Sequence, residues 1–472
     1  MKPSGRPRIL LVNPPIYDFS AFDFWLRPYG LLRVAGRLRG RADLAFFDFL
    51  DRRRPGVGKG PSDSWGRGKF RHTVVEKPAA LRDIPRRFKR YGAPQEDFVA
   101  FLETRGPFDA VLIQGTMTYW YPGIGEVLQA VRSVFPRARC VIGGPYAAIC
   151  RDHARRLGAD LVVSTGDLTP LRDLWGIQPS NSAAPWWEAY GNPDVVAVKL
   201  ADGCPLRCTY CAVPWYSPGF QPRPAAELGA VADQLLELQP ENVVFYDDAL
   251  LYQAGELLLP FLARLRDGGL RAAFHTPNAL HARLLTRDLA RTLVDLGFVG
   301  FFLGFESASA RWQDRTGRKV SGKELARAVA YLLDAGAAPR NITCYLIAGH
   351  PAGDQQELEA SLRFVHSLGV RAMLAEFSPI PGTPDGEACR TTTDLDEPLH
   401  HNKLAWTIRR LGAARLQELK DLANELNREV EAEDGRGTGS RQLTGEGRAK
   451  REGQELGASH ERPRRTPQER EN

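Results

Sequence analysis

The 472-residue sequence has no uninterrupted apolar run of about 18 residues or more, the length that a membrane-spanning helix needs. Its first residues, MKPSGRPRILLVNPP, hold a basic stretch and a strand-length apolar run, without the apolar core and small-residue cleavage site of a signal peptide. These absences predict a cytoplasmic protein without a membrane partner.

Cysteine is scarce, with seven residues in all, and the number is odd. Cytoplasmic thiols are kept reduced, so this set argues against a disulfide framework and leaves the thiols free to act as ligands. Three of the seven lie close together in LADGCPLRCTYCAVPWY, at the spacing Cys204-x3-Cys208-x2-Cys211. The other four are isolated, and we expect them to be small buried hydrophobes.

The composition is that of a globular chain with two or three domains, with 43% hydrophobic and 25% charged residues. The net charge of +7 is concentrated in a basic insert at residues 52–92. Residues 434–472 mix charges of both signs with Gly, Ser and Pro and have almost no large apolar residue. Such a segment cannot offset its ordering entropy by burial, so we expect a disordered tail.

Short apolar runs alternate with amphipathic stretches through residues 1–166, which predicts a doubly wound, Rossmann-like parallel sheet. The expected strands are RILLVN, LAFFDFL, DAVLIQG, RCVIGG and ADLVVS. Residues 167–194 lack a clear period and are expected to be a linker. Six further strand-and-helix units predict a complete or partial β/α barrel over 195–385, whose chemistry sits on the loops after the strands. A helical segment is expected at 386–433.

The three clustered cysteines follow the first expected barrel strand. Cysteine thiolates at short spacings on a loop are typical ligands of iron–sulfur clusters, and three of them leave one iron of a four-iron cluster without a protein ligand. A structural zinc is an alternative, but it needs a fourth ligand, and none is near in sequence. Three unrelated buried thiols are a second alternative.

Cys204, Cys208 and Cys211, with Tyr210 before the last cysteine, resemble the motif of the radical S-adenosylmethionine (SAM) superfamily. The resemblance implies a [4Fe–4S] cluster whose free iron binds SAM, and reductive cleavage of SAM to a 5′-deoxyadenosyl radical. It also implies an electron donor such as flavodoxin or ferredoxin.

Segments after the later barrel strands extend the resemblance and imply contacts with SAM. These are Asp247 and Asp248 in FYDDALL, Glu306 and Ser307 in LGFES, and Gly349 in LIAGHP, together with Tyr210. The aspartates could instead cap a helix. His275 and Asn278 in FHTPN are as readily explained as turn or core residues, and His400 and His401 as surface or interface histidines.

The first part resembles the cobalamin-binding-like domains that precede the barrel in many radical SAM enzymes. The resemblance rests on VNPP, QGTMTYWYPG and VIGGPYA, and it points to Thr116, Thr118, Gly143 and Gly144 as cobalamin contacts. The sequence lacks the Asp-x-His-x-x-Gly motif that supplies a histidine to cobalt. Members without this histidine bind cobalamin in another way or bind none.

The sequence therefore predicts a radical SAM enzyme acting on an unidentified small-molecule or peptide substrate, with methyl transfer if cobalamin binds. A cobalamin-independent enzyme that modifies tRNA or a small molecule is an alternative. Methylthiolation is disfavoured because that class adds a second three-cysteine cluster, and only Cys140 and Cys150 precede the motif. A non-catalytic zinc or iron–sulfur protein that binds nucleic acid through residues 52–92 is another alternative, although a solvated or lid-forming loop better fits that insert.

Overall fold

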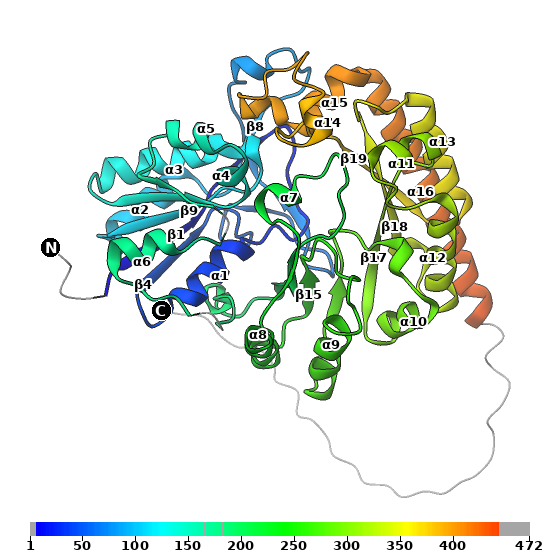
Figure 1. The fold of residues 1–472 in the computed structure, drawn as a ribbon, viewed down its shortest axis with the longest axis horizontal. Helices are drawn as coiled ribbons and strands as arrows, with labels where there is room; N and C mark the ends of the chain where they lie inside the picture. The colour runs from blue at the N-terminus through cyan, green and yellow to red at the C-terminus, as the bar shows by residue number, and fades with distance from the viewer. Residues whose placement is uncertain (1–5, 165, 181–182, 443–472) are drawn as a thin grey trace, which may run out of the picture.

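Two α/β halves make up the computed structural model, which describes residues 6–164, 166–180 and 183–442 (Figure 1). The first half holds a five-stranded parallel sheet in the order β11-β10-β9-β1-β4. Its strands are β1 (Arg8–Asn13), β4 (Asp43–Asp48), β9 (Ala110–Gln114), β10 (Arg139–Gly143) and β11 (Leu161–Val162). The strands are rich in Val, Ile and Leu because both faces of the sheet are covered. The predicted doubly wound sheet is confirmed.

Helices cover the two faces of this sheet. They are α1 (Tyr29–Leu38), α2 (Gln95–Arg105), α3 (Tyr121–Val134), α4 (Pro145–Ile149), α5 (Arg151–Arg156) and α6 (Thr169–Trp175). Phe98, Leu102 and Val127 belong to the core on one face, whereas Leu31 and Leu171 belong to the core on the other. The chain runs from β1 to β4 on one side and then returns to β9 on the other, so the strand order reverses beside β1. Doubly wound sheets bind ligands at such a point.

The second half holds six parallel strands in chain order. They are β12 (Val195–Val198), β15 (Asn242–Phe245), β16 (Ala273–His275), β17 (Phe298–Glu306), β18 (Ile342–Ala348) and β19 (Arg371–Glu376). Within the described residues β12 and β19 do not pair, so the barrel is partial.

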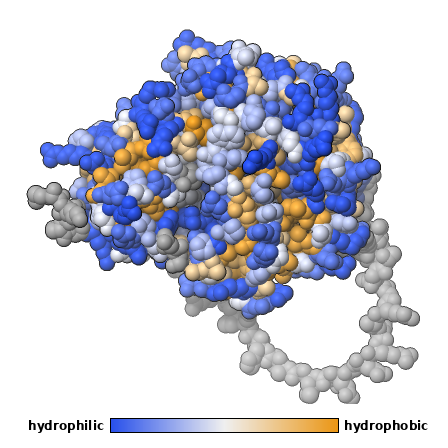
Figure 2. Space-filling model, viewed as in Figure 1, coloured by the Kyte–Doolittle hydropathy of each residue, from blue (hydrophilic) through white to orange (hydrophobic). Residues whose placement is uncertain are grey.

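Helices line the outside of this open barrel (Figure 1). They are α8 (Ala225–Leu238), α9 (Leu258–Asp267), α10 (Arg287–Asp295), α11 (Ala310–Thr316), α12 (Gly322–Asp334) and α13 (Gln355–Ser367). The helix α12 begins at a capping box, in which Ser321 and Glu324 satisfy each other's backbone N–H groups. In the view of Figure 2 the surface is mixed, with hydrophobic areas between the hydrophilic ones.

The region expected to be a linker contains α6 and the single turn Trp187–Tyr190, and Trp187 is buried in the barrel core. After the barrel come α14 (Pro384–Glu387), α15 (Lys403–Leu411) and α16 (Ala413–Gln442). The first residues of the expected disordered tail therefore continue α16, and its remainder lies outside the described residues. No helix in the described part of the chain is both long enough and apolar enough to span a membrane.

The basic insert is folded onto both halves. Its short strands β5 (Gly58–Lys59), β6 (Gly68–Phe70), β7 (His72–Val74) and β8 (Lys89–Tyr91) form two small sheets with β2 (Ile16–Asp18) and β3 (Phe22–Asp23). Three of its arginines form ion pairs within the chain: Arg52 with Asp23, Arg67 with Asp63, and Arg90 with Glu126. These cations are thus used within the fold.

Aromatic residues from the first half and the insert close the amino-terminal end of the barrel. The ring of Trp25 lies 4.5 Å from that of His275, and Trp65 lies 5.2 Å from the same histidine. Trp25 packs with Val195, Val244 and Phe302 on the inner wall, and Phe24 and Trp65 pack against this cluster. His275 is hydrogen-bonded to Asn242, the first residue of β15. We call Phe24, Trp25 and Trp65 the aromatic plug.

Candidate functional site

The three clustered cysteines lie on a loop, residues 204–212, which we call the cysteine loop. It is carried by the hairpin of β13 (Ala201–Gly203) and β14 (Phe220–Pro222) and runs into the short helix α7 (Val213–Tyr216), which lies beside α4 of the first half (Figure 1). Gly203 has φ of +77°, and a Cβ atom there would lie 1.8 Å from the carbonyl oxygen of Gly219, so only glycine fits. The three thiols are free and half-buried.

A network of side chains fixes the cysteine loop against the ends of the barrel strands. The hydroxyl of Thr209 donates to Asp385, and the backbone N–H of Asp385 donates to the carbonyl of Thr209 at 3.2 Å. His350 Nδ1 accepts from Trp312 Nε1 at 3.2 Å and from the backbone N–H of Ala352 at 3.1 Å. Its Nε2 therefore carries the proton and donates to Asp385 at 3.1 Å. The loop is held in one position before any ligand binds.

Tyr210, expected to contact SAM, takes part in this packing. Its ring stacks on Trp312 with centroids 5.8 Å apart and meets His350 edge-on at 6.1 Å. Its hydroxyl is buried and interacts with the thiol of Cys208. The ring and the hydroxyl therefore both support the cysteine loop.

Asp247 and Asp248 follow β15 as expected, and no helix begins there, since α9 starts ten residues later at Leu258. Asp247 Oδ1 accepts from the backbone N–H groups of Leu200 at 2.9 Å and Ala201 at 2.8 Å, which fixes the chain as it leaves β12. Its Oδ2 is buried without a partner, and burial raises the pKa of this carboxyl to about 7. Asp248 is paired with Lys199 at 2.8 Å.

Glu306, the last residue of β17, is buried and has a φ of +68°, a strained backbone conformation for a residue with a side chain. One carboxylate oxygen accepts from Lys319 Nζ at 2.8 Å, and the other has no partner among the described residues. Burial acts to lower the pKa of Lys319, but Glu306 and the neighbouring thiols raise it above its usual value. The pair is therefore ionic, with one carboxylate oxygen left for a ligand.

Ser307 and Gly349 are engaged within the fold. The Ser307 hydroxyl accepts from the backbone N–H of Ser309 at 3.1 Å. Gly349 has φ of +78°, its carbonyl accepts from Trp406 Nε1 at 2.8 Å, and a Cβ atom there would lie 2.7 Å from the Thr407 hydroxyl. The close approach that requires glycine at this position is thus an approach to α15.

Burial raises the pKa of all three clustered thiols, to about 11 for Cys211, while Lys319 acts in the opposite direction. Thiols must lose their protons to bind a metal, so metal binding at this loop releases protons. No group of three His, Cys, Asp or Glu side chains in the described part of the chain converges on a single ion position. Three thiols spread over one loop suit the separate irons of a cluster better than one tetrahedral zinc.

Several residues of this site were not predicted. Lys319, His350 and Asp385 lie far apart in the sequence, and each acquires its role only through a partner that the fold brings to it. Lys319 lies in a polar loop, and Asp385 follows the residues Gly-Thr-Pro. Neither position has a local sequence pattern that separates it from ordinary surface residues.

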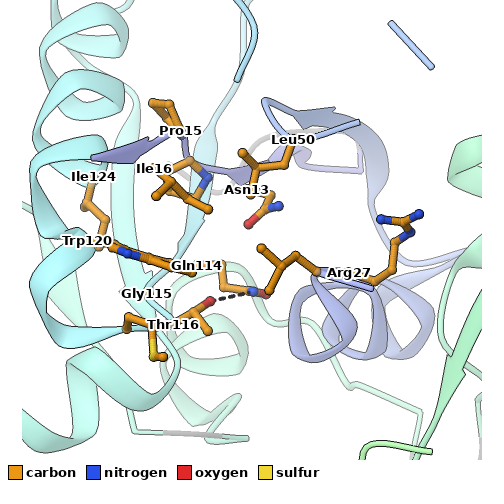
Figure 3. Close-up of a pocket in the computed structure, with 13 residues that line it drawn as sticks. Asn13, Pro15, Ile16, Arg27, Leu50, Gln114, Gly115, Thr116, Trp120 and Ile124 are labelled. Atoms are coloured by element: carbon orange, nitrogen blue, oxygen red, sulfur yellow. Dashed lines mark hydrogen bonds between the residues drawn. The ribbon is translucent and has the colours of Figure 1, made fainter. Parts of the chain in front are cut away.

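The first half has a small pocket of about 60 Å³ where its strand order reverses (Figure 3). Its walls come from the ends of β1 and β9, the start of α3 and the segment with Leu26 and Arg27. Gln114 Nε2 donates to the Thr116 hydroxyl at its edge. Ligand pockets commonly measure roughly 300–1,000 Å³, so the pocket in its present shape does not hold a corrin.

Of the four expected cobalamin contacts, Thr116 lines this pocket. Thr118 is buried and bonded to His401 Nδ1 at 2.9 Å. Gly144 has φ of +97°, and a Cβ atom there would lie 2.5 Å from the carbonyl of Gly115, so this glycine serves the packing of the sheet end. A Cβ atom at Gly143 would meet Val163 at 3.2 Å.

The two neighbouring histidines differ in their surroundings. His401 is fully buried between the two halves, and its Nε2 donates to the carbonyl of Leu395 at 3.0 Å. Its expected interface position is thus observed. His400 is partly exposed and hydrogen-bonded to the carbonyl of Asp394.

Comparison with known proteins finds a family match for the second half of the chain. Residues 198–365 match the Radical SAM superfamily. The chain is 25% identical over 291 residues to the ribosomal protein uS12 methylthiotransferase RimO of Pelotomaculum thermopropionicum, which covers 59% of this chain and 61% of that protein. It is 30% identical over 207 residues to RimO of Salinispora arenicola, covering 40% and 38% of the two chains. The chain thus spans less than two thirds of these relatives.

Two solved structures share the arrangement of both halves. One is the radical SAM methyltransferase TsrM from Kitasatospora setae, with cobalamin and a [4Fe–4S] cluster bound; the TM-score is 0.59 at 13% identity, over 89% of this chain and 91% of that one. The other is the cobalamin-dependent SAM radical enzyme OxsB, with a TM-score of 0.51 at 11% identity, over 85% and 57%. The chain therefore contains a region that matches the Radical SAM superfamily, and it has the fold in two α/β halves that TsrM and OxsB share.

Proposed function

We propose that this protein is an enzyme that cleaves SAM reductively at a [4Fe–4S] cluster and uses the resulting radical on a small-molecule or peptide substrate. The observation that carries the proposal is the cysteine loop: three free thiols at the carboxyl end of the first barrel strand, within the matched region. When bound, the cluster and SAM supply a 5′-deoxyadenosyl radical that abstracts a hydrogen atom.

The protein's own residues hold and orient these groups. Cys204, Cys208 and Cys211 are the proposed iron ligands, and Thr209 and Tyr210 fix the loop between them. Of the expected SAM contacts, Glu306 and Asp247 fit best, because each keeps one buried carboxylate oxygen without a partner. Such an oxygen is costly to bury and is satisfied by a ligand hydroxyl or ammonium group.

Two lysines hold carboxylates at the strand ends: Lys319 pairs with Glu306, and Lys199 pairs with Asp248. Asp248, Ser307 and Gly349 are already engaged within the fold, and their proposed role is to position the strand ends rather than to bind SAM directly. Tyr210, whose hydroxyl lies beside the Cys208 thiol, remains a proposed contact near the cluster.

The test is anaerobic reconstitution with iron and sulfide, followed by dithionite and SAM, with 5′-deoxyadenosine measured by mass spectrometry. We expect about four irons per chain, a cluster absorption band and 5′-deoxyadenosine. Cys208→Ala should lose all three, whereas Cys150→Ala, which removes a buried thiol from the first half, should keep them. A single bound zinc, or a loaded cluster without SAM cleavage, would contradict the proposal.

Cobalamin-dependent methyl transfer is a second candidate. It is favoured by the shared fold with TsrM and OxsB and by the pocket at the point where the strand order of the first sheet reverses. The pocket is too small for a corrin as it stands, so binding requires the segment with Leu26 and Arg27 to move away from the strand ends. Incubation with hydroxocobalamin and gel filtration tests this: retained corrin absorption, reduced by Thr116→Trp, is expected, and no retained corrin in the wild type would eliminate this candidate.

Two other functions are less well supported. A methylthiotransferase of the expected kind needs a further set of three cysteines in its first half, and here only the buried Cys140 and Cys150 are present. A nucleic-acid binder would use the cations of the basic insert, and three of these, Arg52, Arg67 and Arg90, are already paired with carboxylates.

A further inference from the structure

The cysteine loop reaches the surface beside the carboxyl end of α11. Pro205 and Arg207 are exposed, and the backbone N–H of Thr209 donates to the carbonyl of Thr316 at 3.3 Å. A Cβ atom at Gly317 would lie 3.3 Å from the carbonyl oxygen of Arg207 and 3.4 Å from the Cα atom of Cys208. The surface at the end of α11 is therefore the outer cover of the proposed cluster.

Four exposed arginines gather on this cover, and we call them the arginine face: Arg207, Arg311, Arg315 and Arg318. Arg311 and Arg315 are one helical turn apart on α11 and so lie on the same side of it. Arg318, 76% exposed, pairs with Asp314, the one carboxylate of α11. No carboxylate among the described residues forms an ion pair with Arg207, Arg311 or Arg315.

Little of this charge is neutralised among the described residues: Arg318 pairs with Asp314, and Arg315 acts electrostatically on Asp385 without forming an ion pair. Arg52, Arg67 and Arg90 of the insert are paired with carboxylates, whereas three of the four arginines here are exposed next to the cysteine loop without an ion pair among the described residues. The edge of the molecule that carries α11 and α13 is also mainly hydrophilic in Figure 2. Like charges gathered on one face repel one another, and such a face attracts an oppositely charged partner and steers its approach.

We propose that the arginine face is the docking surface for a small acidic protein that delivers single electrons to the cluster. The proposal rests on the proposed function, because that reaction needs one electron from outside the chain. The electron leaves the reduced redox group of the donor, which is oxidised by one electron, and enters the cluster, which is reduced by one; no proton or group is transferred. Small, electrostatically steered interfaces are typical of such short-lived redox encounters.

Binding is tested with flavodoxin, an acidic flavoprotein, and the reconstituted protein at increasing ionic strength. The charge-reversal variant Arg311→Glu/Arg315→Glu should bind flavodoxin at least tenfold more weakly than the wild type, and with a much smaller salt dependence. The matched control is Arg264→Glu/Arg266→Glu, which makes the same charge change at the end of α9, near the amino-terminal ends of the strands. The control should bind like the wild type.

Activity gives a second readout. With flavodoxin, its reductase and NADPH, the α11 variant should form 5′-deoxyadenosine at least tenfold more slowly than the wild type at limiting flavodoxin. With dithionite, which needs no docking, the two proteins should have equal rates.

Three results would overturn the proposal. One is unchanged flavodoxin binding by the α11 variant; another is equal loss in the α9 control, which would reveal a general charge effect. The third is an equal loss with dithionite, which would mean that these arginines serve SAM, an anionic substrate or the loop itself. Failure of the proposed function looks different: the wild type would form no 5′-deoxyadenosine with dithionite, whatever the binding results show.

Discussion

Lys319 Nζ lies 2.8 Å from Glu306 Oε1 and joins the loop before α12 to the end of β17, directly beside the cysteine loop. A Cβ atom at Gly304, two residues earlier on β17, would lie 2.5 Å from the same ammonium nitrogen. The glycine thus makes room for the lysine to reach the strand end, and the lysine holds the side chain of Glu306, whose backbone is strained.

Removing Lys319 should therefore destabilise the protein more than a surface substitution does. Lys319→Met leaves the Glu306 carboxylate buried without a counter-charge, and we expect a loss of about 2–3 kcal/mol, at the low end for a buried pair because Lys319 is 21% exposed. Adding Glu306→Gln to the Lys319→Met variant should restore at least half of the lost free energy of unfolding. Urea unfolding of Lys319→Met, Glu306→Gln and the double variant measures this, and additive losses would show that the two side chains are not coupled.

Asp247 should make stability depend on pH in the neutral range. Burial raises the pKa of its carboxyl to about 7 in the folded protein, so its contribution is complete at acid pH and is lost as the pH rises through 7. Asp247→Asn keeps an acceptor for the N–H groups of Leu200 and Ala201 without the charge. We expect the variant to be about 2 kcal/mol more stable than the wild type at pH 8, with the gain vanishing toward pH 5. A gain that is independent of pH would contradict the charge argument.

His401 should act in the opposite direction. Burial lowers the pKa of this imidazole to about 4, so the unfolded chain takes up a proton near pH 6.5 while the folded chain does not. Stability is therefore lost as the pH falls from 6.5 to 4, by about 3 kcal/mol from this group. His401→Gln should be about 1 kcal/mol less stable at pH 7 because the bond to Thr118 is lost. It should also show a flatter decline below pH 6.5 in urea unfolding.

Two other buried histidines, His275 and His281, have pKa values lowered by burial to about 3 and about 4. They contribute equally to the pH dependence of stability in the wild type and in His401→Gln. The difference between the two proteins therefore isolates the contribution of His401. Parallel stability curves below pH 6.5 would show that His401 is protonated in the folded protein.

The aromatic plug should be important for stability. Trp25→Ala removes a fully buried side chain and should cost about 3–5 kcal/mol. Trp215→Ala is the matched control, because this tryptophan is 42% exposed, and it should change the free energy of unfolding by no more than about 0.5 kcal/mol. Calorimetry of the two variants measures the difference, and similar unfolding temperatures would mean that Trp25 contributes little to the barrel.

Local patterns predicted most of the fold and the position of the cysteine loop. Strands such as β1 and β17 are unbroken apolar runs bounded by turns, and their positions follow from neighbouring residues alone. The spacing of Cys204, Cys208 and Cys211 is likewise a local property, and the structure places the three on one loop after the first barrel strand.

The remaining features depend on contacts between distant segments. The reason for a glycine at position 349 is an approach to Thr407 in α15, and no pattern near LIAGHP reveals it. Trp65 lies in a stretch with many cations, and nothing near it in the sequence indicates that it packs against the amino-terminal end of the barrel as part of the aromatic plug. The pairing of Lys319 with Glu306 joins two loops whose sequences carry no complementary signal.

The closed amino-terminal end of the barrel also bears on how this chain can be divided. A fragment starting at residue 195 would retain every cysteine of the loop, yet it would expose the inner faces of Val195, Val244 and Phe302 to water where Trp25 now covers them. The second half is therefore not an independent module, and its expression alone should give an aggregating product rather than a smaller enzyme.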